Sequence, residues 1–462
     1  MTRHSPLARR AFLQRLSQLG VASAATPWAI NLAAMGEAAA FNASDYKALV
    51  CIFMTGGNDN GNTLIPYDST GHAQYATARS GLAIARSALS ATALSPTFSG
   101  GRQYALAPEL APLKTLFDAK QLAVQFNVGP LVQPTTLAEY QMRAVPLPPK
   151  LFSHNDQQSI WQSSQAEGAV RGWGGAMGDL ALSSNGNALF SCVSVTGNAV
   201  FLAGQSALAY QVGVSGPVGI ESVVGDLYGS AACSDALRTL ITQTRSHVME
   251  NEHNRITSRA IASYGTLSAA LASSAGSFDA LLPDSVSGTN QPLNRQLKMV
   301  ARMIAASGAL GMKRQVFMVA LGGFDNHDNL STNHPRQLGQ VGRAMAGFQA
   351  AMDQLGVGDK VTAFTASDFG RTITSNGDGS DHGWGGHHFV MGGAVKGGAF
   401  YGTAPEAVLG GPEDTGRGRY IPSSSVSQYA ATLASWFGVS SAEMPLVAPY
   451  IGNFSTRNLG FV

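Results

Sequence analysis

The sequence predicts an α/β protein with a mostly parallel central sheet. Apolar runs of strand length alternate with helical patterns along the chain, which is typical of parallel α/β folds. These runs lack strict alternation of apolar and polar residues, as expected for strands that are covered on both faces. The chain has 462 residues, which is long enough to bury a large core.

The individual elements follow from the position of each apolar run. Strands are predicted at residues 46–54, 122–128, 315–321 and 360–365, and helices at residues 108–120, 235–271, 293–312 and 335–355. Residues 175–230 are rich in Gly, Ser, Ala and Val with only short apolar runs, and we expect a small β-rich insertion there. The pattern therefore predicts one α/β domain with an insertion around residues 170–290 that acts as a cap.

The amino terminus has the pattern of a targeting segment. Ala8-Arg-Arg-Ala-Phe-Leu13 is a twin-arginine motif, a mildly apolar stretch follows, and Ala38-Ala-Ala40 offers small residues for cleavage. We expect residues 1–40 to be a signal peptide for the twin-arginine export machinery, and residues 41–462 to be a periplasmic or secreted protein. The apolar stretch is interrupted by polar residues and Pro27, so we expect no stable membrane span after processing.

Composition and cysteine usage argue against several classes of protein. The formal charge is +2, and four of the 30 basic but only one of the 28 acidic side chains lie in residues 1–40, so the mature chain is near neutral and no nucleic-acid partner is expected. The chain lacks a dinucleotide fingerprint after the first strand and cysteine patterns for haem or iron–sulfur clusters, which argues against an oxidoreductase. Three cysteines are too few for a disulfide framework, although Cys192 and Cys233 could pair in an oxidising compartment.

Acidic residues and histidines gather where predicted strands end. Phe324-Asp-Asn-His-Asp328 follows one strand, and Asp368 follows another, ahead of a Gly-rich loop that carries Asp381-His382. Ligands of open α/β sheets bind at the carboxyl ends of the strands, so we expect these side chains to meet. Alternate residues of an extended segment point the same way, which would let Asp325 and His327 bind one ion together. The pattern predicts a metal-centred hydrolytic site, and the alternative is a set of polar loops without metal.

Further candidates lie after the first strand and before a predicted helix. Asp59 follows two glycines that let the backbone approach a ligand, although the same residues could form an ordinary turn. Ser153 could cap the helix or act as a nucleophile, and the adjacent His154 could be a ligand or an acid/base group. The Arg371 guanidinium suits a tetrahedral anion, and His388 could supply a ligand or a proton.

Taken together, these motifs resemble an exported bacterial family catalogued as domain of unknown function 1501. The twin-arginine leader and five motifs carry the resemblance: Gly56-Gly-Asn-Asp59, Phe152-Ser-His-Asn-Asp-Gln157, Gly323-Phe-Asp-Asn-His327, Asp368-Phe-Gly-Arg-Thr372 and Asp381-His-Gly383. That family is in turn similar to the alkaline phosphatase and sulfatase superfamily, whose members bind one or two divalent ions at the strand ends of an α/β/α sandwich. The resemblance implies an alkaline phosphatase-like fold and a divalent metal cofactor.

The superfamily resemblance also implies a role for each matching residue. Ser153 matches the nucleophile at a helix start. The matching metal ligands are Asp59, Asp325, His327, Asp368 and His382. The chain departs from the superfamily pattern in two places: one residue separates Asp325 from His327 where three are usual, and Asp368 is followed by Phe369 where a histidine is usual.

We therefore expect an exported metal-dependent hydrolase that acts on a phosphate or sulfate ester of a small molecule or polysaccharide. The metal, which could be Zn, Mn, Ca or Mg, would polarise the ester oxygen and lower the pKa of Ser153 or of a water molecule. Arg371 would stabilise the anion, and His154 or His388 would protonate the leaving group. The alternative, which the two departures favour, is a catalytically degenerate envelope protein that binds a polysaccharide or a partner without turnover.

Overall fold

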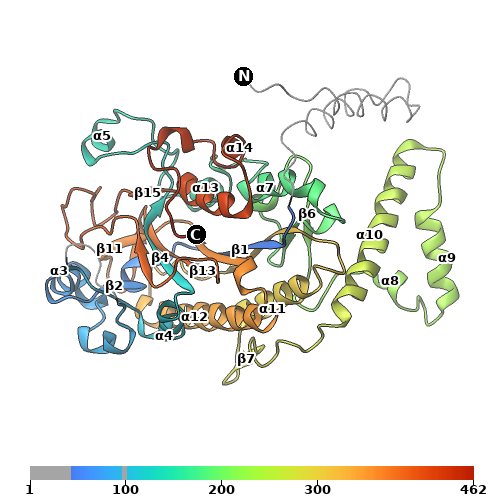
Figure 1. Cartoon of the computed structure of the whole chain (residues 1–462), viewed down its shortest axis with the longest axis horizontal. Helices are drawn as coiled ribbons and strands as arrows, with labels where there is room; N and C mark the ends of the chain where they lie inside the picture. Colours follow the sequence, from blue (N-terminus) through green and yellow to red (C-terminus); the bar gives the residue numbers. More distant parts are fainter. Residues whose placement is uncertain (1–42, 96–100) are drawn as a thin grey trace. The chain divides into compact units, whose positions relative to one another are not determined.

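A nine-stranded sheet forms the centre of the computed structural model, which describes residues 43–95 and 101–462 as parts of one unit (Figure 1). The predicted signal peptide lies outside the described residues. The strand order is β14 (Ala399–Tyr401), β4 (Leu122–Gly129), β13 (Gly386–Met391), β10 (Val361–Ser367), β1 (Lys47–Met54), β9 (Arg314–Leu321), β5 (Cys192–Ser194) and β6 (Ala209–Gln211), and β15 (Ser424–Ser425) also pairs with β4. The four predicted strands are β1, β4, β9 and β10, and their apolar side chains are buried on both faces.

Within this sheet only β13 runs against the other strands. β1 is parallel to β9 and β10, and β5 is parallel to β6 and β9, whereas β13 is antiparallel to both β10 and β4. Gly386 at the start of β13 pairs with Val128 near the end of β4, and Met391 pairs with Leu122 at its beginning. The prediction of a mostly parallel sheet is confirmed, and β13 begins at the edge where its neighbours end.

Helices cover both faces of the sheet, which confirms the mixed α/β fold (Figure 1). One face carries α4 (Ala111–Asp118), α11 (Pro292–Ala305) and α12 (Leu330–Gln354), and the other carries α7 (Trp173–Ala181) and α13 (Val426–Phe437). The helix α6 (His154–Ser163) also lies on this second face, where its Trp161 ring packs against Tyr429 of α13. On this second face Phe364 of β10 packs against Trp173 and Tyr429, with ring centroids 5.4 and 5.7 Å apart. The sheet is therefore held between two apolar layers.

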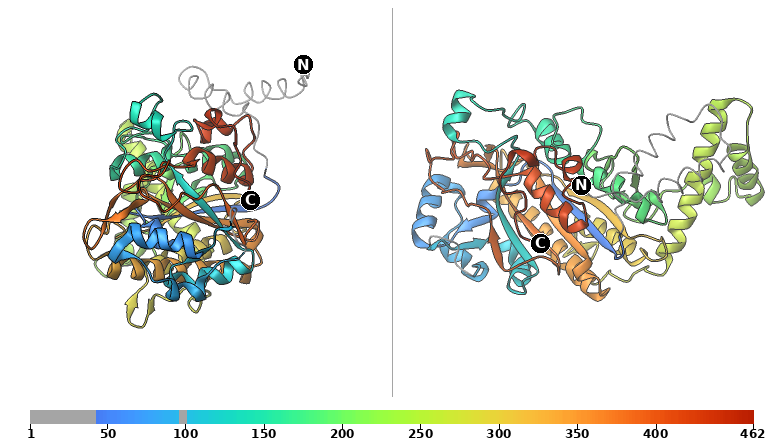
Figure 2. Two further views of the ribbon diagram at one scale, coloured as in Figure 1. Left: turned by 90° about the vertical axis from the view of Figure 1, so that its left-hand side faces the viewer. Right: turned by 45° about the horizontal axis from the view of Figure 1, so that its top comes forward.

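Residues 170–290, expected as an insertion, divide between the core and a peripheral arm. The helix α7 and the strands β5 and β6 belong to the central layers. The peripheral helices are α8 (Glu221–Val224), α9 (Ala231–Thr242) and α10 (Val248–Ala272), and Figures 1 and 2 show α9 and α10 standing away from the sheet. The single long helix predicted at residues 235–271 is thus two helices. Cys192 is buried in β5 and Cys233 is exposed on α9, and both are free thiols.

The remaining elements are short. Besides short 3-10 helices, they are α3 (Ser69–Arg79), α5 (Leu137–Met142), α14 (Met444–Val447), the antiparallel pair of β2 (Leu64–Pro66) with β3 (Tyr104–Leu106), and two hairpins, β7 (Ser285–Val286) with β8 (Thr289–Asn290) and β11 (Arg371–Ser375) with β12 (Ser380–His382). The β11–β12 hairpin lies between β10 and β13 in the sequence and pairs Arg371 with His382. Among the described helices, none has both the length and the apolar character needed to cross a membrane.

Candidate metal centre

Three segments bring histidines and an acid together at the carboxyl edge of the sheet. The loop after β9 supplies Asp325 and His327, β12 supplies His382, and the first turn of α6 supplies His154. Gly56, just beyond the end of β1, allows this approach because it has φ of 116° and because a side chain there would collide with the backbone amide of Asp325. The backbone of the sheet edge thus places four chemically active side chains within reach of one another.

The spacing of these side chains fits a single metal ion. One donor atom from each of His154, Asp325 and His382 lies within 4.8 Å of the others. The Nε2 atoms of His154 and His382 are each 3.4 Å from a carboxylate oxygen of Asp325. Metal–ligand distances of about 2.0–2.2 Å at tetrahedral angles put neighbouring ligand atoms about 3.4 Å apart. The donor set therefore has the separation that a small divalent cation requires.

The imidazoles of His154 and His382 are each oriented by a contact at Nδ1, which directs Nε2 toward Asp325. His382 Nδ1 lies 2.7 Å from the Phe152 carbonyl oxygen, which can only accept, so Nδ1 carries the hydrogen. His154 Nδ1 lies 2.6 Å from Asp368 Oδ2, and His154 Nε2 is buried without a hydrogen-bond partner. Metal-binding histidines usually donate their other ring hydrogen to a carboxylate or a carbonyl in this way. The Nε2 atom of each ring therefore faces Asp325.

His327 completes the cluster and is its most exposed histidine. Its Nε2 atom lies 3.0 Å from Asp325 Oδ1 and 2.9 Å from His382 Nε2, and its Nδ1 atom lies 3.4 Å from Asp381 Oδ1. Since His382 carries its hydrogen on Nδ1, the two Nε2 atoms can face each other only by sharing a proton or a cation. We refer to His154, Asp325, His327 and His382 together as the His/Asp cluster.

Arg371 holds the carboxylate of Asp325 in place. It is fully buried, and its guanidinium donates to Asp325 Oδ1 at 2.8 Å, to the Gly56 carbonyl at 2.9 Å and to the Ser380 carbonyl. The Arg371 guanidinium is therefore occupied by groups of the protein itself, whereas the sequence had suggested that it would bind a substrate anion. Burial alone would raise the pKa of Asp325, but the hydrogen bond and charge of Arg371 hold it below its ordinary value. Asp325 is consequently an anion at neutral pH.

Asp368 lies behind His154 and away from the open side of the cluster. Its side chain has no exposed area, and its two oxygens accept hydrogen bonds from His154, from Gln158 Nε2 at 2.7 Å and from the Gly56 amide at 3.0 Å. The sequence predicted Asp368 as a metal ligand, whereas in the structure it is the hydrogen-bond partner of His154. This hydrogen bond raises the pKa of His154, while burial lowers the pKa of His382.

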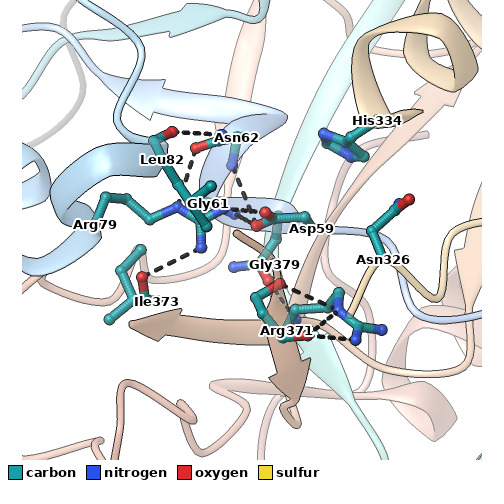
Figure 3. A network of polar contacts seen from close by, with 12 residues as sticks. Asp59, Gly61, Asn62, Arg79, Leu82, Asn326, His334, Arg371, Ile373 and Gly379 are labelled. Carbon is teal, nitrogen blue, oxygen red and sulfur yellow. Dashed lines mark hydrogen bonds and ion pairs between the residues drawn. The ribbon is translucent and has the colours of Figure 1, made fainter. Parts of the chain in front are cut away.

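Asp59, also predicted as a ligand, is engaged in a separate buried network. Figure 3 shows its carboxylate facing the Arg79 guanidinium, with which it forms an ion pair, and the backbone amides of Gly61 and Asn62 also donate to it. The side chains of Asp59 and Arg79 are almost fully buried. The structure therefore uses Asp59 to fix the turn after β1, and does not bring it into the His/Asp cluster.

Ser153 immediately precedes α6, but its side chain accepts no hydrogen bond from a backbone amide of that helix. Its hydroxyl donates to Asp156 Oδ2 at 2.9 Å, and Asp156 is itself buried. Ser153 is thus adjacent to His154 in the sequence, and among the described residues its hydroxyl makes no recorded contact with the His/Asp cluster.

His387 and His388 lie inside β13 and are not part of the cluster. Both are buried, and His388 packs against Trp161 with ring centroids 4.8 Å apart. Burial lowers the pKa of each to about 3, so both are neutral in the folded protein. The role of proton donor expected for His388 is therefore not supported by its position, because a strand interior covered by α6 and α13 separates it from the open edge.

Two contacts that orient the cluster had not been assigned from the sequence. Gln158 follows His154 by four residues, so a helix beginning at His154 places both on one face, and this spacing was a usable signal. The Phe152 carbonyl carried no such signal because any residue provides a carbonyl. Phe152 has φ of 72°, a conformation that L residues rarely adopt and that the surrounding fold must enforce.

Comparison with known proteins supports the motif-based resemblance. Residues 46–413 match the family described as protein of unknown function (DUF1501), and this range contains every residue of the His/Asp cluster together with Asp368 and Arg371. A search of curated proteins found no match. Because the family match spans most of the chain, this protein belongs to the DUF1501 family.

Proposed function

We propose that this protein is an exported, metal-dependent hydrolase of a phosphate or sulfate ester, with a distant alkaline phosphatase-like fold. The observation that carries the proposal is the convergence of three imidazole Nε2 atoms on the Asp325 carboxylate at the carboxyl edge of the sheet. Open α/β sheets bind their ligands at this edge. The cluster is also accessible, since 44% of the Asp325 side chain is exposed.

The donor set favours zinc among the metals expected from the sequence. Imidazole nitrogen suits zinc, whereas magnesium and calcium prefer oxygen ligands. A bound divalent ion would act as a Lewis acid on the ester and on its nucleophile. The chain would hold it through His154, Asp325, His327 and His382, while Arg371 and Asp368 keep Asp325 and His154 in position.

Two nucleophiles are compatible with the proposal, namely Ser153 and a water molecule. Ser153 lies at the amino-terminal end of α6, where backbone amides favour an anion, and its hydroxyl donates to the buried carboxylate of Asp156. Replacing Ser153 by alanine separates the two: loss of turnover with retained metal identifies Ser153, and retained turnover identifies water.

The experiment that tests the proposal pairs metal analysis with ester hydrolysis. We expect about one equivalent of metal in the wild type, and turnover of an aryl phosphate or an aryl sulfate. Asp325→Asn and His382→Ala should each lose most of the metal, and turnover should fall by about 100-fold or more. The matched controls are Asp328→Asn, an exposed acid in the same loop, and His253→Ala, an exposed histidine on α10.

The controls should retain both metal and turnover. A folded Asp325→Asn or His382→Ala protein with unchanged metal content and hydrolysis would contradict the proposal. Because Asp325→Asn leaves the buried Arg371 without its anionic partner, its folding has to be checked by circular dichroism, and His382→Ala provides the independent test.

A second function has one specific observation in its favour. Arg371 is directed at Asp325 and two carbonyls, Ser153 pairs with Asp156, and His388 is buried in β13, so three of the four groups expected for catalysis are engaged elsewhere. These contacts support a degenerate envelope protein that binds metal and a polysaccharide or partner without turnover. Stoichiometric metal with no hydrolysis of any phosphate or sulfate ester would favour this second function.

A further inference from the structure

A pocket close in sequence to the cluster residue His154 is lined by groups that suit a sugar. It lies in the connection between α5 and α6 and has a volume of about 580 Å³, within the range of small-molecule sites. Its lining residues are Tyr140, Gln141, Arg143, Val145, Leu147, Pro148, Lys150 and Leu151. We call this feature the 140–151 pocket.

The wall of the pocket and one residue of the cluster, His154, belong to one continuous segment. Lys150 and Leu151 line the pocket, Phe152 provides the carbonyl that orients His382, and His154 follows two residues later. The pocket wall, the carbonyl that orients His382 and the cluster residue His154 are therefore consecutive in the chain.

The segment is held rigidly. The Phe152 and Tyr140 rings pack against buried Trp384 at centroid distances of 6.5 and 5.6 Å, and Arg419 lies over the Phe152 ring at 5.1 Å. The sequence Pro146-Leu-Pro-Pro149 restricts the backbone further. Arg143 and Lys150 have positive φ, which costs about 1 kcal/mol or more at each residue and requires support from surrounding packing. The pocket is thus preformed, which favours binding.

The lining contains two cations and no acid. Arg143 and Lys150 are exposed, and the nearest recorded anion is Asp156, whose Oδ2 atom lies 3.7 Å from Lys150 Nζ. Asp156 also accepts a hydrogen bond from Ser153. In a chain with a formal charge of only +2, this local excess of positive charge indicates an anionic ligand.

The other lining groups indicate that this ligand is a sugar. The Tyr140 ring offers an apolar face, and the Gln141 amide both donates and accepts hydrogen bonds, which suits a hydroxylated ring. We propose that the 140–151 pocket binds an acidic sugar unit adjacent to the ester, so that the substrate is a polysaccharide bearing several sulfate or phosphate groups. That the bound polysaccharide is a substrate rests on the proposed hydrolase function, whereas the binding of an acidic sugar does not.

The test measures binding of labelled polymers by fluorescence anisotropy, with protein kept free of metal by a chelator. Dextran sulfate and phosphorylated dextran distinguish the two anionic groups, and neutral dextran of the same length is the reference. We expect at least one anionic dextran to bind about tenfold or more tightly than neutral dextran. The double variant Arg143→Glu with Lys150→Glu should lose that difference.

The control reverses two exposed charges elsewhere, Arg259→Glu on α10 and Lys313→Glu before β9, at the opposite end of that strand from the cluster. It should bind as the wild type does. Equal binding of anionic and neutral dextran, or an unchanged affinity in the Arg143/Lys150 double variant, would overturn the pocket assignment. Equally tight binding of single-stranded poly(dT) at the same sites would also overturn it, in favour of a general polyanion surface.

The design separates the failure of the pocket from the failure of the hydrolase. Asp325→Asn should retain dextran binding, because it changes the cluster and not the pocket. Arg143→Glu alone, which keeps the contact of Lys150 with Asp156, should retain turnover of a small aryl ester, because such a substrate does not reach the pocket. Polymer binding without ester turnover would support the pocket assignment and contradict the hydrolase proposal. Ester turnover without polymer binding would support the hydrolase proposal and contradict the pocket assignment.

Discussion

Asp368 and Arg371 are the residues whose contacts in the structure differ most from the roles that their side-chain types suggest. Their types suit a metal ligand and an anion clamp, yet the structure directs Asp368 to His154 and Arg371 to Asp325. Charged groups that are buried need partners, and here each partner belongs to the His/Asp cluster. The charge of each residue is therefore used to fix another residue rather than to meet a ligand directly.

The first prediction concerns the positioning role of Asp368. Asp368→Asn keeps the size of the side chain but replaces one acceptor oxygen by a donor, so it cannot accept from Gly56, Gln158 and His154 as the carboxylate does. His154 should lose its fixed tautomer, and metal affinity should fall by about 10- to 100-fold. Competition with a chromophoric chelator measures this affinity directly.

Asp353→Asn is the control for this change. Asp353 also accepts hydrogen bonds from two glutamine side chains, Gln121 and Gln349, but lies on α12 away from the cluster. Its metal affinity should equal that of the wild type. An Asp368→Asn protein that binds metal as tightly as the wild type would show that His154 is not a ligand or needs no orientation.

At the scale of single elements, strand direction decides which histidines reach the cluster. β13 runs antiparallel to β10, so the residues just before it lie at the carboxyl edge of the sheet, and His382 is among them. His387 and His388 come after the strand has begun and are covered by helices. From the sequence, His382, His387 and His388 were all expected in one loop, because a short apolar run does not reveal the direction of the strand that it forms.

The second prediction concerns the acid stability of the elements that bury histidine. Burial lowers the pKa of His334 on α12 to about 4 and that of His387 and His388 on β13 to about 3. In the unfolded chain these groups titrate near pH 6.5, so between pH 6.5 and about 4 the unfolded state binds more protons than the folded state. Unfolding free energy should therefore fall as pH falls, by up to about 1.4 kcal/mol per pH unit for each histidine.

Urea unfolding at a series of pH values, with a chelator present, measures this slope. His388→Gln should reduce it by up to about 1.4 kcal/mol per pH unit even if the variant is less stable overall. His253→Gln, which changes an exposed histidine, should keep the wild-type slope. An unchanged slope in His388→Gln would mean that His388 does not stay neutral in the folded protein.

Sequence patterns predicted the long strands well and the assembled contacts poorly. Continuous apolar runs identified β1, β4, β9 and β10, because strands buried on both faces need apolar residues throughout. The three-residue strands β5 and β6 carry too few residues for such a signal. Asp325, His327 and His382 were identified as ligand candidates, whereas the ion pair of Asp59 with Arg79 could not be, since it depends on where α3 packs.

At the scale of the whole molecule, the His/Asp cluster exists only when distant parts of the chain have folded together. His154 and Asp368 form their hydrogen bond across 214 residues of sequence, and His327 meets His382 across 55. An unfolded chain therefore offers no metal site, and metal binding should stabilise the folded state. Twin-arginine export, which carries proteins that have already folded, would let the metal be bound before translocation.

The last prediction follows from this order of events. Replacing the motif residues by Arg9→Lys and Arg10→Lys should keep the protein in the cytoplasm of a bacterial host as a folded precursor that already contains metal. Cell fractionation with immunoblotting reports the location, and elemental analysis of the retained protein reports the metal. The control Arg3→Lys with Arg15→Lys changes the same residue type outside the motif and should still be exported. Export of the Arg9/Arg10 variant at the wild-type level would contradict twin-arginine export, and a retained folded precursor without metal would show that the cluster is loaded only after export.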